Sequence, residues 1–110
     1  MENQELTATH DQLLELHSRL FEAGHHAAAY HILAAATHCA GDFNDRDRLA
    51  EIKRLAMDRG AWLDDKGEKI SNAAALRRGS KGVFASLAST VEAMIVRIKS
   101  DAVIEKSKAR

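Results

Sequence analysis

The sequence predicts an all-α protein: a single compact bundle of four or five helices, built on an antiparallel helical hairpin, with a long C-terminal helix. The 110 residues include no proline, so helices can run without a kink. Aromatic residues make up 5% of the chain and no apolar run alternates with period two, which gives strands little support. A chain of this length can form one hydrophobic core. We therefore expect one domain over residues 1–110, frayed at 1–5 and at about 107–110.

The first two predicted helices form a hairpin that turns at Gly24. The first helix should begin near Thr7 or Thr9, because either hydroxyl can cap a helix N-terminus. Its apolar residues lie on two overlapping faces: Leu6, Leu13, Leu14, Leu16, Leu20 and Phe21. Gly24 can adopt the left-handed conformation that ends such a helix. The second helix should cover residues 26–40 and end at Gly41, and its seven alanines allow another helix to approach closely.

A third helix is predicted over residues 46–59, with Asn44 or Asp45 as its N-cap. Its apolar residues form one stripe: Leu49, Ile52, Leu55 and Ala56. Gly60 should end this helix. A hydrophobic residue just past a terminal glycine commonly folds back onto the last turn, so we expect Trp62 to cover the core.

The last helix has the clearest periodicity. Residues 68–78 could form a short helix, and 79–82 form a break before a helix over residues 83–106. The apolar residues of this last helix recur at intervals of three and four residues: Phe84, Leu87, Val91, Met94, Ile95 and Ile98. Val103 and Ile104 lie off this stripe and indicate more apolar surface than one chain covers. This set of residues is expected to form core or a dimer interface, and a homodimer is one hypothesis.

The predicted hairpin resembles one repeat of the tetratricopeptide family over residues 13–40. That family has a glycine at the turn and small and large apolar residues at fixed offsets in the second helix, matched here by Gly24, Ala29, Leu33 and Ala36. The chain departs from the pattern at His17, where a small residue is expected, and no proline follows the second helix. The resemblance implies a helical protein-interaction module.

Four histidines are placed symmetrically about the turn. His10 and His17 lie fourteen and seven residues before Gly24, and His31 and His38 lie seven and fourteen after it. A hairpin folded at this glycine brings them level in pairs, and histidines on facing helices can bind zinc or another transition metal. Few carboxylates accompany them, so hydrogen-bonded or exposed histidines are the alternative. Paired imidazoles would also repel when protonated, which would loosen the hairpin below about pH 6.

A basic loop precedes the last helix. Its residues are candidates for binding an anion: Arg77, Arg78, Ser80, Lys81 and Gly82. Glycines free the backbone amides, and a helix N-terminus adds partial positive charge. The loop lacks the spacing of a nucleotide-binding P-loop, and a solvated connection with Ser80 as N-cap is the alternative.

Charge and motif content limit the function. Residues 1–76 carry 8 Lys/Arg and 13 Asp/Glu, and residues 77–110 carry 8 and 3, so a net charge of −5 precedes one of +5. The formal net charge of the whole chain is zero, which argues against nucleic-acid binding. One cysteine, no apolar leader and no membrane-length apolar run favour the cytoplasm. No catalytic or nucleotide-binding motif is found.

These observations lead to two hypotheses. The first is a cytoplasmic, non-catalytic helical protein without a cofactor, which acts through contacts with an unidentified protein partner or a second copy. The alternative is a histidine-based metal-binding bundle. The two differ in where the four imidazoles point.

Overall fold

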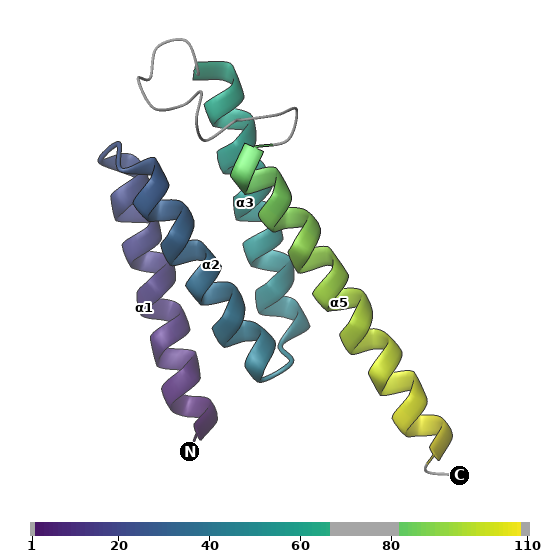
Figure 1. The fold of residues 1–110 in the computed structure, drawn as a ribbon. Helices are drawn as coiled ribbons and strands as arrows, with labels where there is room; N and C mark the ends of the chain where they lie inside the picture. Colours follow the sequence, from purple (N-terminus) through teal and green to yellow (C-terminus); the bar gives the residue numbers. More distant parts are fainter. Residues whose placement is uncertain (1, 67–81, 109–110) are drawn as a thin grey trace.

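The computed structural model describes residues 2–66 and 82–108 of the chain. These residues form four helices, α1 (Glu2–Glu22), α2 (His26–Asp42), α3 (Arg46–Lys66) and α5 (Gly82–Lys108), and no strand (Figure 1). The predicted all-α bundle is therefore confirmed. Helices α1 and α2 pack as one antiparallel hairpin, and α3 and α5 pack as a second. None of these four helices is long and apolar enough to cross a membrane.

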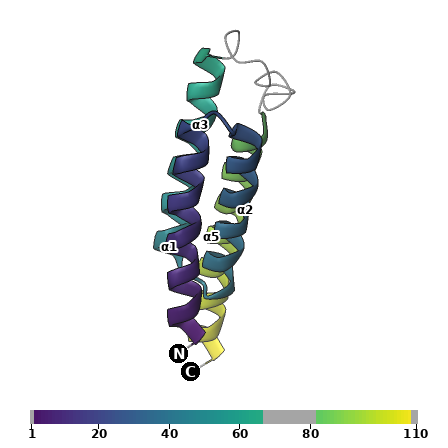
Figure 2. The ribbon, with the colours of Figure 1, turned by 90° about the vertical axis from the view of Figure 1, so that its left-hand side faces the viewer.

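Helix α2 is central to the bundle because it contacts the three other described helices. In Figure 2, α1 lies in front of α3, and α2 lies in front of α5. No Cα atom of α1 comes within 8 Å of α3, so these two helices are joined only through long side chains. The bundle measures 58 × 31 × 15 Å along its principal axes, which makes it a flat molecule.

The hydrophobic core lies along the inner faces of α2, α3 and α5. On α2 the buried apolar residues follow the helical repeat: Ala29, Leu33, Ala36 and Ala40. The buried apolar residues of α3 are Leu49, Ile52, Ala56 and Leu63. On α5 the predicted stripe is confirmed, with Phe84, Leu87, Val91 and Ile95 buried and Met94 and Ile98 partly buried. Three of the four buried α2 residues are alanines, which lets neighbouring helices approach closely.

Helix α1 begins earlier than expected. It starts at Glu2, so the prediction of an N-cap at Thr7 or Thr9 is wrong, and residues 2–5, expected to be frayed, form its first turn. The early glutamates suit the positive end of a helix dipole, and nothing in this segment breaks a helix. The turn is as predicted: Gly24 has φ +89°, and the amide of His25 donates to the carbonyl of Leu20 at 2.9 Å.

The connection between α2 and α3 places its left-handed residue three positions later than expected. Gly41 lies inside α2, which ends at Asp42, and Asn44 has φ 53°. A Cβ at Gly41 would lie 2.5 Å from Cε of Met94, so this glycine makes room for α5. Asp45 is the N-cap of α3, since its Oδ1 accepts from the amide of Arg48 at 3.0 Å.

Gly60 does not end α3, which continues to Lys66. The cost of a glycine inside a helix is about 1 kcal/mol. Continuing the helix buries Leu63, and full burial of a leucine contributes roughly 1.5–3 kcal/mol, which exceeds that cost. Trp62 is consequently helical. It is 42% exposed and covers the edge of the core, with its ring 5.3 Å from that of Phe21.

The predicted helix over 68–78 and the loop residues Arg77, Arg78, Ser80 and Lys81 lie outside the described residues. Gly82 is described, with φ +60°, as the first residue of α5. The anion-binding loop stays a prediction.

Candidate functional site

Two features of the bundle are candidates for function. One is a layer of two buried histidines and two partly exposed arginines between α1 and α3, and the other is a groove between α3 and α5. They lie on different sides of α3.

His10 and His17 are fully buried, with 0% exposure each. They lie seven residues apart on α1, and Phe21 follows four residues later on the same face. Two arginines of α3, Arg48 and Arg59, reach this face and donate hydrogen bonds to the imidazoles. The histidine side chains and arginines thus bridge the wide spacing between α1 and α3.

Both ring nitrogens of His17 have partners. Nδ1–H donates to the carbonyl oxygen of Ala29 at 2.8 Å, and Nε2 accepts from Nε of Arg59 at 3.3 Å. An acceptor at Nε2 requires a neutral imidazole. Burial, and then the positive charge of Arg59, lower the pKa of His17 below its ordinary value, against the opposing effect of the hydrogen bond to Ala29.

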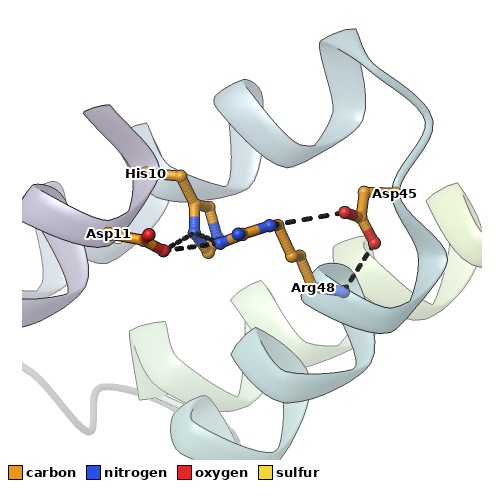
Figure 3. A network of polar contacts seen from close by, with 4 residues as sticks. All are labelled: His10, Asp11, Asp45 and Arg48. Carbon is orange, nitrogen blue, oxygen red and sulfur yellow. Dashed lines mark hydrogen bonds and ion pairs between the residues drawn. The ribbon is translucent and has the colours of Figure 1, made fainter. Parts of the chain in front are cut away.

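His10 belongs to a charged network that ties α1 to the start of α3 (Figure 3). Nδ1 of His10 accepts from Nη1 of Arg48 at 2.7 Å. The same guanidinium pairs with Asp11 at 2.7 Å and with Asp45, the N-cap of α3, at 3.3 Å. Burial and then Arg48 lower the pKa of His10, while Asp11 and Glu51 oppose this shift. The hydrogen bond from Arg48 lowers the pKa of the Asp11 carboxyl.

The four predicted metal ligands do not converge. His10 and His17 are buried beside α3, whereas His31 and His38 are exposed on α2. The ring of His31 lies 5.1 Å from that of Tyr30. Among residues 2–66 and 82–108, no group of three or more histidine, cysteine or acidic side chains is placed to hold a metal ion. The symmetric spacing about Gly24 therefore does not bring all four imidazoles together.

The hydrogen bonds of the histidine–arginine layer link α1 to α2 and α3. The nitrogen lone pair that a general base or metal ligand needs is used to accept from an arginine in both rings. The sequence carries a signal for this layer in the spacing of the two histidines. His10 and His17 continue the apolar face of α1 toward Phe21, which places them in the interior.

The second feature is an open groove of about 630 Å³ between α3 and α5. Most of its lining side chains are small: Ala56, Gly60, Ala61, Ala85, Ala88 and Ser89. Met57 stands exposed at its edge. The groove also contains an ion pair at 2.8 Å between Nζ of Lys53 and a carboxylate oxygen of Glu92, which lowers the pKa of Glu92. Asp64 completes the lining.

The exposed apolar residues of α5 continue the line of the groove. Ala85, Ser89 and Glu92 line the groove, and Val96 and Val103 follow at the same helical spacing. Val96 is 52% exposed, Val103 64% and the neighbouring Ile104 50%. Phe84, Leu87 and Val91 from the predicted interface set are core residues, whereas Val103 and Ile104 face solvent.

Comparison of the chain with protein-family models, with curated proteins and with solved structures gave no match. The tetratricopeptide resemblance stays a prediction. Ala29, Leu33 and Ala36, which carry it, are all buried against neighbouring helices, and close packing alone requires small residues at such positions.

Proposed function

We propose that this chain is a non-catalytic protein-interaction module of the cytoplasm that binds an apolar helical segment in the groove between α3 and α5. The observation that supports this proposal is the groove itself. It is apolar over most of its lining, it is open to solvent, and small side chains of two antiparallel helices leave room for larger ones. Helix-in-groove binding uses this arrangement: large apolar side chains of the guest enter spaces between two host helices.

Three further observations fit this function. Met57 at the edge of the groove can adapt to different apolar surfaces because its side chain is unbranched. The Lys53–Glu92 pair supplies both signs of charge for orienting a guest. Cys39 is the chain's only cysteine, which suits a reducing compartment. The histidine–arginine layer would act as the support that keeps α1 docked on α3.

The proposal can be tested by placing a photo-crosslinking amino acid in the groove. Benzoylphenylalanine would replace Ala61, an exposed residue of the groove, and a matched variant would carry it at Ala28, an exposed residue of α2. We expect defined protein adducts from position 61 and none from position 28. The captured protein would then be purified and its affinity measured by calorimetry.

The affinity measurement decides whether an adduct reflects binding in the groove. A bulky charged side chain in Ala61→Arg fills the groove, so we expect at least a tenfold loss of affinity, about 1.4 kcal/mol. The Ala28→Arg control should bind as the unchanged protein does. Equal labelling at the two positions, or equal affinity of the two arginine variants, would refute the proposed function.

A further inference from the structure

We propose that the segment bound in the groove is α5 of a second copy of this chain, so that the protein is a two-fold symmetric homodimer. This inference rests on the proposed function and names its partner. It is carried by the distribution of small and large side chains along one face of α5.

One face of α5 contains both halves of a complementary contact. Its N-terminal half lies in the groove and carries small side chains, including Ala85 and Ser89. Its C-terminal half carries the exposed Val96 and Val103 on the same face. A two-fold axis across α5 places the large residues of one copy over the small residues of the other. Such a contact is isologous and closes after two copies.

The C-terminal part of α5 has no α3 residues beside it. Gly60 lies opposite Phe84, and Lys53 lies opposite Glu92. Because α3 is antiparallel to α5, its N-terminal end therefore stops short of the C-terminal end of α5. The C-terminal turns of α5, which carry Val103, therefore extend past the turn between α2 and α3 (Figure 1). Isolated helices gain little stability from their own hydrogen bonds, and an apolar extension of this kind is stabilised by packing against another molecule.

Charge on this face is complementary under the same two-fold axis. If the axis passes near Val96, Val103 lies over Ala88 and Ser89 of the second copy, and Lys99 lies beside that copy's Glu92. The acidic residue belongs to the groove, and the basic one lies seven residues further along α5.

The available area matches what a stable dimer needs. Helix α5 has 27 residues, a length of about 40 Å. Helix α3 lies beside roughly the first 25 Å of this length, where the face is about 20 Å wide, and α5 alone gives a width of about 10 Å over the rest, so the face is on the order of 650 Å² for each copy. Specific protein complexes bury about this area per partner. Of the other described helices only α2 contacts α3 and α5, and Met57, Ala61 and Val96 remain exposed, so no described helix covers this face.

Sedimentation equilibrium of the full chain tests the assembly directly. At about 50 µM we expect a mass of twice 12.1 kDa, falling toward the monomer on dilution. Val103→Lys should shift the population to monomer, because a charge at the contact must be desolvated. The helical circular dichroism of this variant should not change, since Val103 is 64% exposed. Leu16→Lys, at an exposed leucine of α1, is the matched control and should remain dimeric.

Cysteine crosslinking tests the position of the axis. In a Cys39→Ser background, Val96→Cys places a thiol near the axis, so mild oxidation should give a covalent dimer. Leu16→Cys, with similar exposure, should give none under the same conditions. The dimer proposal is overturned if the unchanged chain is monomeric at about 100 µM, if Val103→Lys stays dimeric, or if the two cysteines crosslink equally. A monomer whose Ala61 variant labels a different protein would retain the proposed function and lose only this partner.

Discussion

Acid should destabilise this protein at a pH where its carboxylates are still charged, because two neutral histidines are buried against arginines. His10 and His17 both have pKa values lowered in the folded state, with burial as the main cause in each. Between that lowered pKa and the ordinary value of about 6.5, the unfolded chain binds protons that the folded chain does not. The stabilising effect of both histidines is therefore fully present above about pH 6.5 and decreases as the pH falls below it.

The size of the effect follows from proton linkage. One histidine that is neutral when folded and protonated when unfolded changes the free energy of unfolding by about 1.4 kcal/mol per pH unit. The upper limit for His10 and His17 together is therefore about 2.8 kcal/mol per pH unit below about pH 6.5. A domain of this size has a total stability of roughly 5–15 kcal/mol, so this loss is easily measured.

Urea unfolding followed by circular dichroism at about pH 7.5, 6.5 and 5.5 measures this slope. Protein concentration must be held constant, because any dimerisation adds to the apparent stability. His17→Asn is the informative variant: its amide can still donate to the carbonyl of Ala29, but it does not titrate. We expect it to reduce the slope by about half. A double His31→Gln, His38→Gln variant, which removes two exposed imidazoles and leaves the buried pair in place, is the matched control.

Two outcomes would refute this reasoning. The first is a free energy of unfolding that stays constant or increases as the pH is lowered from about 7.5 to about 5.5. The second is a His17→Asn variant that keeps the slope of the unchanged protein. Either result would mean that the imidazole of His17 is not held neutral by its surroundings.

The remaining predictions concern two glycines, a helix cap and a metal. Gly24→Ala should lower the free energy of unfolding by about 1 kcal/mol, since φ is +89° and no atom crowds the site. Gly60→Ala should raise it by about 0.5–1 kcal/mol in the same urea assay, because the new Cβ meets only an ordinary contact at 3.5 Å. Asp45→Ala should cost about 1 kcal/mol, because the amide of Arg48 loses its cap; Asp45→Asn should restore most of it. Zinc calorimetry on untagged protein should give no heat of specific binding, because both nitrogens of His17 are engaged; tight uptake would support the metal-binding alternative instead.

Apolar periodicity predicted the helices, and the structure differs from the prediction mainly at glycines. The predicted ends at Gly41 and Gly60 assumed that a glycine after a helical stripe terminates it. Both glycines instead lie within helices. A Cβ at Gly41 would lie 2.5 Å from Met94 of α5, so this glycine gives space to α5, whereas a Cβ at Gly60 would make only an ordinary contact with Phe84 at 3.5 Å. The difference between a terminating glycine and a packing glycine depends on a helix far away in the sequence, so local patterns cannot resolve it.

Less of the candidate sites than of the helices could be predicted from the sequence. Spacing placed His10 and His17 correctly on one face of α1, but it could place the histidines of α2 only level with them and did not decide whether they would face them. Their actual partners are Arg48 and Arg59, 38 and 42 residues away in the chain. The groove was not predicted, since it depends on the register between α3 and α5. Only Val103 and Ile104, off the main stripe, indicated an uncovered surface.

The two features have opposite physical roles at the two sides of α3. Toward α1, the backbones stay more than 8 Å apart, and long polar side chains fill the space. Such a layer contributes little net stability, because desolvation of the arginines offsets the hydrogen bonds, but it allows few alternative registers of α1. Toward α5, small side chains leave a groove that no described residue fills. The side of α3 that faces α1 is thus filled by polar side chains that fix the register of α1, while the groove between α3 and α5 is mostly apolar and stays open. Burial of apolar area is the larger driving force, so association should proceed through α3 and α5, with α1 held away from the contact.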